Sequence, residues 1–447
     1  MKTTEILAET VLALRPRDIP PEAAAMVKRC ILDLIGSAAA GSGTEAAQAA
    51  RTAGARSSPG GSLPVWFTEL RFYTAWAAMA NSQAASALDL DDGHRAAGGH
   101  PGASIIPAAF AVAEETGATA EELVASIVAG YEVAVRIAAA RDFSRLDTFS
   151  TGRWCSYGTA AAGGVLRRLP PGRLAEALSI AGVLAPGLSA SGYSSVMGNH
   201  VKEGIPWSTF LGLTALDLAR EGFTGPTDLL DHPSYYDSGK ILEGIGKTYA
   251  IEGVYFKPYS CCRWIHSALD ALSALMHEHG IKAREIRKVR VSTFERVQRL
   301  NNQCNPDSPE GAQYSLPFSL AVAAVRGGRA LLPMNPGLLG DPEVVALAEK
   351  VEIEVDVQLD RAFPARVPAR VAIGTARGEF QRLVETPLGD PANPMDFDEL
   401  QAKFRTLTAG TLTTEGQDEM ISAVSCLETG GFPRLLELLR EKPKTLP

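Results

Sequence analysis

The sequence predicts a mainly α protein, in which a large all-helical domain is interrupted by a smaller α+β domain. Ala- and Leu-rich segments with helical spacing of apolar residues fill the chain up to about residue 250, and strand signals are almost absent there. Alternating β-branched runs begin only beyond that point, and helical sequence returns near residue 395. We therefore expect a helical domain over residues 1–253, an α+β lid domain over 254–394 and a helical return over 395–447.

Length and composition narrow the class of protein. The 447 residues exceed the usual size of a single core, and 46% hydrophobic with 21% charged residues is typical of globular proteins. A net charge of −8 argues against a general nucleic-acid surface but is compatible with a small cationic pocket. The N-terminal segment, with Glu5 and Glu9, has neither the apolar run of a signal peptide nor the length of a membrane span.

Cysteine and glycine patterns give no sign of a metal or cofactor. The six cysteines form neither a disulfide framework nor a zinc-like pair, so we expect a cytoplasmic location and no metal. Residues 41–46 imitate a dinucleotide fingerprint, but they follow a predicted helix rather than a strand. A nucleotide cofactor is therefore not expected.

The elements are predicted in chain order from apolar periodicity and turn signals. Helices are expected over residues 4–15, 22–40, 75–90, 104–116, 123–135, 157–168, 173–185 and 206–221, then over 264–279, 312–325 and 397–407. Strands are expected over residues 288–295, 351–357 and 370–375. The last fifty or so residues are expected to pack on the first domain, which would make the α+β unit an insertion.

A polar loop follows the predicted buried helix that ends near Leu90. Residues 89–102 contain three aspartates, two histidines, one arginine and four glycines. A buried helix that delivers Asp89 and Asp92 into such a loop costs free energy unless the carboxylates have partners. A plain surface connection is the alternative, but catalytic groups often lie on loops held by rigid helices, so we favour a functional loop.

Three further segments carry candidate site residues. Arg153 could bind a carboxylate with two parallel hydrogen bonds, or it could be a surface arginine beside a helix start. Lys202 precedes Gly and Pro in a loop suited to ligand binding, or it forms a solvated pair with Glu203. Residues 257–266 place two cations, a phenol, two thiols and an imidazole at the predicted domain junction, where ligand sites are common.

Together these segments resemble the MmgE/PrpD family, which includes 2-methylcitrate dehydratase, cis-aconitate decarboxylase and iminodisuccinate epimerase. The motifs that carry the resemblance are Ala87–Asp92 with His100-Pro101, Val201-Lys202, Gly222–Pro226, Lys257-x-Tyr-x-x-Cys-Arg-x-x-His266, Ala312–Pro317 and Asp390–Pro394. The resemblance implies a helical domain interrupted by an α+β lid, a homodimer and an active site in the cleft between the domains. It also implies cofactor-free chemistry on small di- or tricarboxylates.

The resemblance assigns roles by position. The residues that match the family's active site are Asp89, His100, Lys202, Lys257 and His266. As substrate-binding residues we expect Arg153, Tyr259, Arg263 and Asp92. Three positions depart from the dehydratase and decarboxylase pattern, because Phe149 replaces a histidine, Gly93 a threonine and Phe318 a tyrosine.

These departures and the Lys-Glu-Gly-Ile-Pro-Trp segment resemble the iminodisuccinate epimerase branch. We therefore expect a cofactor-independent epimerase that acts on a small (amino)dicarboxylate such as iminodisuccinate by removing a proton α to a carboxylate. The alternatives are a lyase, either a dehydratase or a decarboxylase, and a degenerate member that only binds an anion.

Elementary chemistry agrees with this expectation. Proton removal builds negative charge that Arg153, Lys202, Lys257 and Arg263 could stabilise. Epimerisation needs one base and one acid, whereas dehydration also needs an acid for the departing hydroxide. Clustered cations and burial are expected to lower the pKa of Lys202 or Lys257 enough to make one a neutral base, with His100 as the complementary acid or base.

Overall fold

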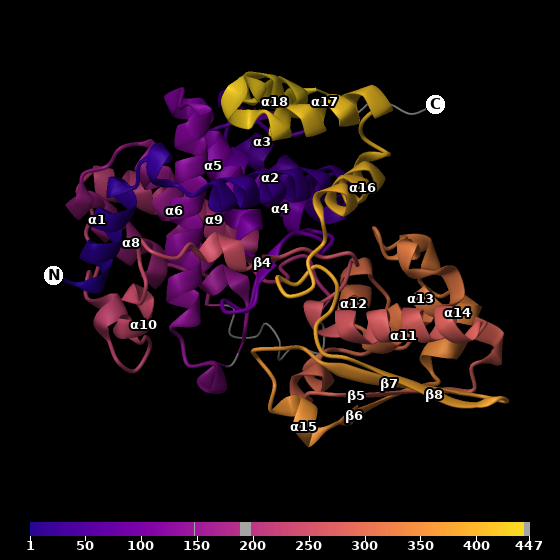
Figure 1. Cartoon of the computed structure of the whole chain (residues 1–447). Helices are drawn as coiled ribbons and strands as arrows, with labels where there is room; N and C mark the ends of the chain where they lie inside the picture. Colours follow the sequence, from indigo (N-terminus) through magenta and orange to yellow (C-terminus); the bar gives the residue numbers. More distant parts are fainter. Residues whose placement is uncertain (147, 188–197, 442–447) are drawn as a thin grey trace.

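The computed structural model describes residues 1–146, 148–187 and 198–441, and it contains a large helical body beside a smaller body built on a four-stranded sheet (Figure 1). The helical body contains α1 (Thr3–Ala13), α2 (Pro21–Gly41), α3 (Glu45–Ser57), α4 (Thr74–Ser86), α5 (Gly102–Thr116), α6 (Ala120–Ala139), α7 (Cys155–Leu166), α8 (Pro171–Val183), α9 (Ile205–Arg220) and α10 (Ser238–Leu242). At the end of the chain, α16 (Phe397–Thr408), α17 (Thr414–Ser425) and α18 (Gly431–Arg440) pack on this body. Two small strand pairs complete it: β1 (Leu63–Pro64) with β2 (Arg71–Phe72), and β3 (Gly93–His94) with β4 (Val254–Tyr255).

The smaller body is a mixed sheet with helices on one side. Its elements are α11 (His266–His279), β5 (Lys288–Thr293), α12 (Pro309–Gln313), α13 (Leu316–Arg326), α14 (Pro342–Ala348), β6 (Val351–Val355), α15 (Val357–Asp360), β7 (Ala369–Thr375) and β8 (Gly378–Val384). The strand order is β6-β5-β7-β8, with β5 parallel to β6 and antiparallel to β7. Buried Val289 and Val291 of β5 lie opposite Ile373 and Val371 of β7, and α11 covers β7 and β8 (Figure 1).

The two bodies have separate hydrophobic cores. One core collects buried side chains from Leu7 to Phe256 and again from Met395 to Leu439, and the other collects those from Cys261 to Ile373. The predicted mainly α fold class is confirmed. The boundaries 1–253, 254–394 and 395–447, and the insertion they imply, stay a prediction, which we propose on the strength of this division of the cores.

Some elements differ from the sequence-based expectation. The helix predicted over residues 75–90 ends at Ser86, because the carbonyl groups beyond it bind side chains and Asp89 adopts a left-handed φ of 56°. Periodicity predicts neither α3, whose sequence is mostly polar and alanine-rich, nor β8, whose side chains are almost all exposed or half-buried. Both elements depend on packing against neighbours that local sequence does not specify.

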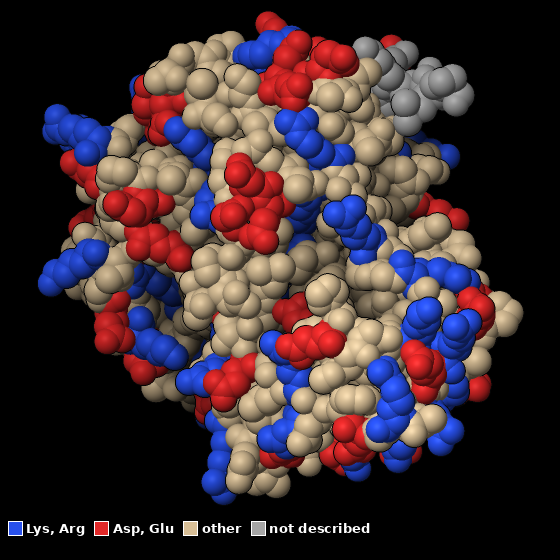
Figure 2. Space-filling view, turned by 45° about the vertical axis from the view of Figure 1, so that its right-hand side comes forward, with Lys and Arg blue, Asp and Glu red and all other residues tan. Residues whose placement is uncertain are grey.

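The face in Figure 2 intersperses Lys and Arg with Asp and Glu and has no large area of one sign. The expectation that the protein lacks a general nucleic-acid surface stays a prediction, which the net charge of −8 supports. Within the described ranges, no helix combines the length and the apolar character that crossing a bilayer requires.

The chain just after α4 is held by side chains from distant elements. The carbonyl oxygens of Ser86, Ala87, Leu88 and Leu90 accept hydrogen bonds from Lys202 Nζ (2.8 Å), Gln313 Nε2 (3.1 Å), Ser260 Oγ (2.5 Å) and Lys403 Nζ (2.7 Å), respectively. Carbonyl groups at a helix end need such partners, and cations are favoured there by the helix dipole. The segment that carries the candidate carboxylates is therefore fixed by both bodies and by the returning helix α16.

Lys403 is the residue of α16 that binds the segment after α4. Its charge is balanced by Asp33, a buried aspartate of α2. The Lys403 Nζ lies 2.6 Å from Asp33 Oδ1, and both side chains are almost fully buried. We expect Lys403→Met to lower the free energy of unfolding by about 3–5 kcal/mol, because Asp33 is left as a buried charge without its partner. Urea unfolding measures the change.

The double variant Asp33→Asn with Lys403→Met serves as the control. It removes both charges, so we expect it to recover at least half of the lost stability. A loss below about 1 kcal/mol in the single variant would contradict a buried pair that matters for folding.

Glycine is required at position 93 because the ring of Tyr255 leaves no room for a side chain, and not because of the φ of Gly93. A Cβ built on Gly93 would lie 2.3 Å from the ring of Tyr255, its partner across the β3–β4 pair. We expect Gly93→Ala to cost about 1–3 kcal/mol through overpacking, whereas Gly43→Ala, where a Cβ meets nothing within 4 Å, should be nearly neutral. Thermal unfolding of the two variants tests this, and equal melting temperatures would be the contrary result.

Candidate active site

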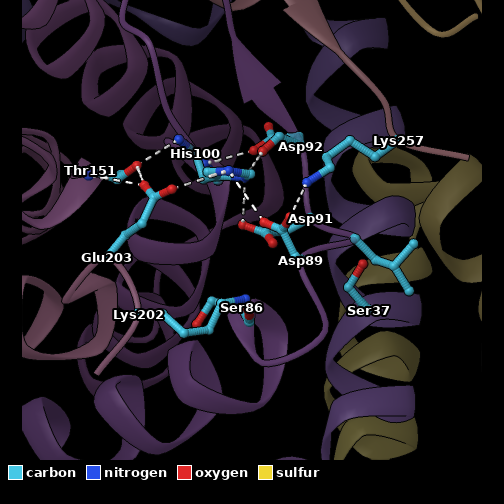
Figure 3. Close-up of polar contacts among 12 residues, drawn as sticks. Ser37, Ser86, Asp89, Asp91, Asp92, His100, Thr151, Lys202, Glu203 and Lys257 are labelled. Carbon is cyan, nitrogen blue, oxygen red and sulfur yellow. Dashed lines mark hydrogen bonds and ion pairs between the residues drawn. The ribbon is translucent and has the colours of Figure 1, made fainter. Parts of the chain in front are cut away.

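A small cavity lies where the carboxyl end of α4 meets the segment before α9. It is lined by Gln83, Ser86, Asp89, Asp91, His100, His200, Val201, Lys202, Glu203, Ile205 and Pro206. Three of the predicted catalytic residues, Asp89, His100 and Lys202, are in this lining. Figure 3 shows His100 between Glu203 on one side and the aspartates of the loop on the other. This cavity is the candidate active site.

Asp89 is paired with a buried lysine that is outside the cavity lining. Its Oδ2 lies 2.8 Å from Lys257 Nζ and its Oδ1 lies 3.5 Å from His100 Nε2. Burial raises the pKa of Asp89, but the Lys257 and Lys202 ammonium groups outweigh burial, so the pKa is lowered overall. Asp89 is therefore ionised at neutral pH and compensates the charge of Lys257.

Lys257 itself is fully buried. Burial would lower the pKa of Lys257, but the attraction of Asp89 is stronger and the pKa is raised above its ordinary value. The expectation that burial makes this lysine a neutral base is therefore wrong, because it overlooks the carboxylate within ion-pair distance. Lys257 is an ammonium that holds Asp89 in place.

His100 is surrounded by acceptors at both ring nitrogens. Its Nδ1 lies 2.9 Å from the carbonyl oxygen of Asp92 and 3.3 Å from Asp91 Oδ2. Its Nε2 points towards Asp89 and lies 3.9 Å from Glu203 Oε1. Burial lowers the pKa of His100, but Asp91 and Glu203 raise it more, to about 9. The imidazole is therefore protonated at neutral pH and can donate a proton into the cavity from Nε2.

Glu203 is a cavity residue that the sequence analysis considered only as a possible surface partner of Lys202. Its Oε2 accepts hydrogen bonds from the backbone N–H of Thr151, at 3.0 Å, and from the Thr151 hydroxyl. Thr151 also accepts from the backbone N–H of His100 at 3.0 Å, and the Gly152 N–H donates to the Glu203 carbonyl oxygen at 2.8 Å. Lys202 has a left-handed φ of 46°. The adjacent side chains of Lys202 and Glu203 therefore reach different partners, Ser86 and Thr151, and sequence spacing does not predict this.

Tyr259 and Arg263 are outside the cavity lining and hold the loop that contains Leu388. The Tyr259 hydroxyl donates to Asp270 Oδ1 at 2.9 Å, and Asp270 Oδ2 accepts from the Leu388 N–H at 2.7 Å. Arg263 donates to the Leu388 carbonyl oxygen at 2.8 Å, and its guanidinium lies over the Tyr255 ring. Neither predicted substrate-binding residue is in the cavity lining.

His266 belongs to the same network. Its Nδ1 lies 3.2 Å from Arg263 NH1 and its Nε2 lies 3.1 Å from the carbonyl oxygen of Cys261. Burial and the neighbouring Arg263 lower the pKa of His266 well below its ordinary value, so the imidazole is neutral. His266 therefore has a structural role in the smaller body, and it is not part of the cavity lining.

The remaining predicted substrate-binding residues are also outside the lining. Arg153 is exposed in the short turn Thr151–Arg153. The Asp92 carboxyl group accepts hydrogen bonds from the Tyr131 hydroxyl (2.5 Å) and the Gly102 N–H (2.9 Å), and burial raises its pKa to about 7. Asp92 thus anchors the start of α5, while its backbone carbonyl orients His100.

The three departures from the family pattern have structural explanations. Phe149 packs against the rings of Phe143 and Trp264, with centroids 5.2 and 5.9 Å away. Phe318 is fully buried in the core of the smaller body, and Tyr255 fills the space beside Gly93. None of these positions brings a polar side chain into the cavity.

Asp89, Asp91 and His100 have potential ligand atoms that all lie within 4.8 Å of one another. Such a donor set suits a divalent cation only where its negative charge is not already compensated. Here Lys257 pairs with Asp89 and the protonated His100 faces Asp91, so positive charge already balances the aspartates. The expectation of a metal-independent site therefore stays a prediction, which this pairing supports.

The chain is similar to known proteins over most of its length. The family model of the MmgE/PrpD N-terminal domain matches residues 5–237, and that of the C-terminal domain matches residues 259–429. A cis-aconitate decarboxylase-like protein of Aspergillus oryzae is 26% identical over 95% of this chain and 94% of its own length. A cis-aconitate decarboxylase of Aspergillus terreus is 27% identical over 94% of this chain and 92% of its own length. With both domain models matched in order along nearly the whole sequence, the chain belongs to the MmgE/PrpD family.

Proposed function

We propose that the protein is a cofactor-independent lyase that decarboxylates or dehydrates a small di- or tricarboxylate in the cavity beside His100. The observation that carries this proposal is the His100 imidazole, whose Nε2 faces the cavity while carboxylates hold the ring and raise its pKa. The names of the similar proteins, cis-aconitate decarboxylases, favour the lyase alternative over the expected epimerase. At 26–27% identity they support the reaction class and leave the substrate open.

The chemistry needs a proton donor and a cation. In decarboxylation the bond to the leaving carboxylate breaks, carbon dioxide departs, and the electron pair left on carbon takes a proton, which His100 can supply. In dehydration the same proton would go to the departing hydroxide, and a carboxylate of the lining would take the α-proton whose bonding electron pair forms the double bond. Lys202, whose Nζ is anchored on the Ser86 carbonyl at 2.8 Å, offers positive charge to a substrate carboxylate.

Other features of the family resemblance stay predictions. We propose a homodimer because the family resemblance implies one. We propose a cytoplasmic location because the six cysteines form no disulfide framework in the sequence pattern. A degenerate member remains the second alternative, and it would bind small carboxylates without turning them over.

Proton NMR in deuterated water with two tricarboxylates, cis-aconitate and 2-methylcitrate, and two dicarboxylates, malate and iminodisuccinate, tests the reaction class. A lyase forms a product with a new carbon skeleton or a new double bond. An epimerase would instead exchange an α-proton without a new skeleton, and a degenerate member would leave every spectrum unchanged.

The same assay tests the residues. We expect His100→Gln and Lys202→Met each to reduce kcat/KM by about a hundredfold or more, because they remove the proton donor and the cation. Lys288→Met, which removes an exposed lysine of β5, is the matched control and should keep wild-type turnover. Turnover close to wild type in the His100 variant would refute its role.

A further inference from the structure

Glu203 differs from the other carboxylates of the cavity lining in how its charge is compensated. Asp89 has a lysine ammonium at 2.8 Å, and Asp91 lies 3.3 Å from the protonated ring of His100. Glu203 Oε2 is instead held by neutral donors, the N–H and hydroxyl groups of Thr151. Its Oε1 forms only a long ion pair with the protonated His100 ring, at 3.9 Å from Nε2, and it shares this charge partner with Asp91. Neutral donors fix the position of a carboxylate without cancelling its negative charge at a distance.

The side chain of Glu203 is also accessible from the cavity. Its side chain keeps 23% of its surface exposed, against 6% for Asp89 and 1% for Asp91. A ligand in the cavity therefore meets Glu203 more directly than it meets either aspartate. Because Thr151 binds Oε2, the glutamate cannot swing away from the ligand without losing two hydrogen bonds.

The lining offers few cations for substrate carboxylates. Lys202, His100 and His200 are the basic side chains of the lining, and His200 lies 3.7 Å from Glu310 Oε1, while Arg153, Tyr259 and Arg263 lie elsewhere. Two carboxylates of a ligand can approach Lys202 and His100. Glu203 follows Lys202 in the chain and lies 3.9 Å from His100 Nε2, so a third carboxylate on such a ligand would meet Glu203.

We propose that Glu203 is a specificity-determining residue whose carboxylate selects dicarboxylates over tricarboxylates. The inference rests on the proposed function for the general class of substrate and narrows that class to dicarboxylates. The physical cause is like-charge repulsion, which discriminates between ligands by penalising the wrong one. A protic substituent in place of the third carboxylate could donate a hydrogen bond to Glu203 Oε1.

Binding of two unreactive probes tests the proposal. Tricarballylate is glutarate with one more carboxylate on its central carbon, so the two probes differ in the group that matters. Isothermal titration calorimetry at neutral pH gives the ratio of their Kd values. We expect wild-type protein to bind glutarate more tightly, and Glu203→Gln to shift the ratio towards tricarballylate by about tenfold or more.

Two further variants separate charge from structure. Glu203→Asp keeps the charge and should keep the preference for glutarate even if both affinities fall. Glu221→Gln removes an equal charge from the exposed end of α9 and should leave the ratio unchanged. Should Glu203→Gln fail to fold, the salt dependence of the wild-type ratio decides, because added salt screens repulsion and should narrow the preference.

The contrary results are distinct. A ratio that Glu203→Gln leaves unchanged, a wild-type preference for tricarballylate, or absence of binding of both probes would overturn the proposal. Neither probe carries a leaving hydroxyl or a double bond, so the ratio does not depend on turnover. Failure of the lyase proposal would appear in the NMR assay alone and would leave the binding ratio intact.

Discussion

The carbonyl groups that follow α4 need hydrogen-bond donors, and this need connects the whole molecule. Donors come from the segment before α9, from the smaller body and from α16, through Lys202, Gln313, Ser260 and Lys403. Because each donor comes from a different part of the chain, the carboxylate loop can be correctly placed only when both bodies and the returning helix have assembled. The active-site geometry is therefore a result of tertiary assembly.

Charge balance is the second constraint on the site. Buried ions are tolerated only with partners, and the structure pairs Asp89 with Lys257 and Asp33 with Lys403. His100 remains protonated because the surrounding carboxylates outweigh its burial. The result is a ring that is rigid, cationic and directed into a small cavity, which suits proton donation to a carbanion or a leaving hydroxide.

Patterns local in sequence predicted much of the fold and part of the site. Helical periodicity gives α2, α9 and α16 with ends close to those observed, and the density of charged groups marks the loop from Asp89 to His100. Long-range pairings could not be predicted from the sequence. The spacing of residues along the chain does not indicate that Glu203 contacts Thr151, or that the nearby Asp89 raises the pKa of Lys257 where burial alone would lower it. Residues of one sequence motif can also have different structural roles. Lys257 pairs with Asp89 of the loop, whereas His266 contacts the carbonyl oxygen of Cys261.

The central claim is that His100 carries a proton at neutral pH, and an NMR titration tests it most directly. The seven histidines would be isotope-labelled and the His100 signal assigned by its loss in His100→Gln. The structure predicts a pKa of about 9 for His100, far above the ordinary 6.5, and a lower pKa when Asp91→Asn removes the nearest charge on Nδ1. A pKa at or below 6.5 in the wild-type protein would contradict the proton-donor role and the lyase mechanism built on it.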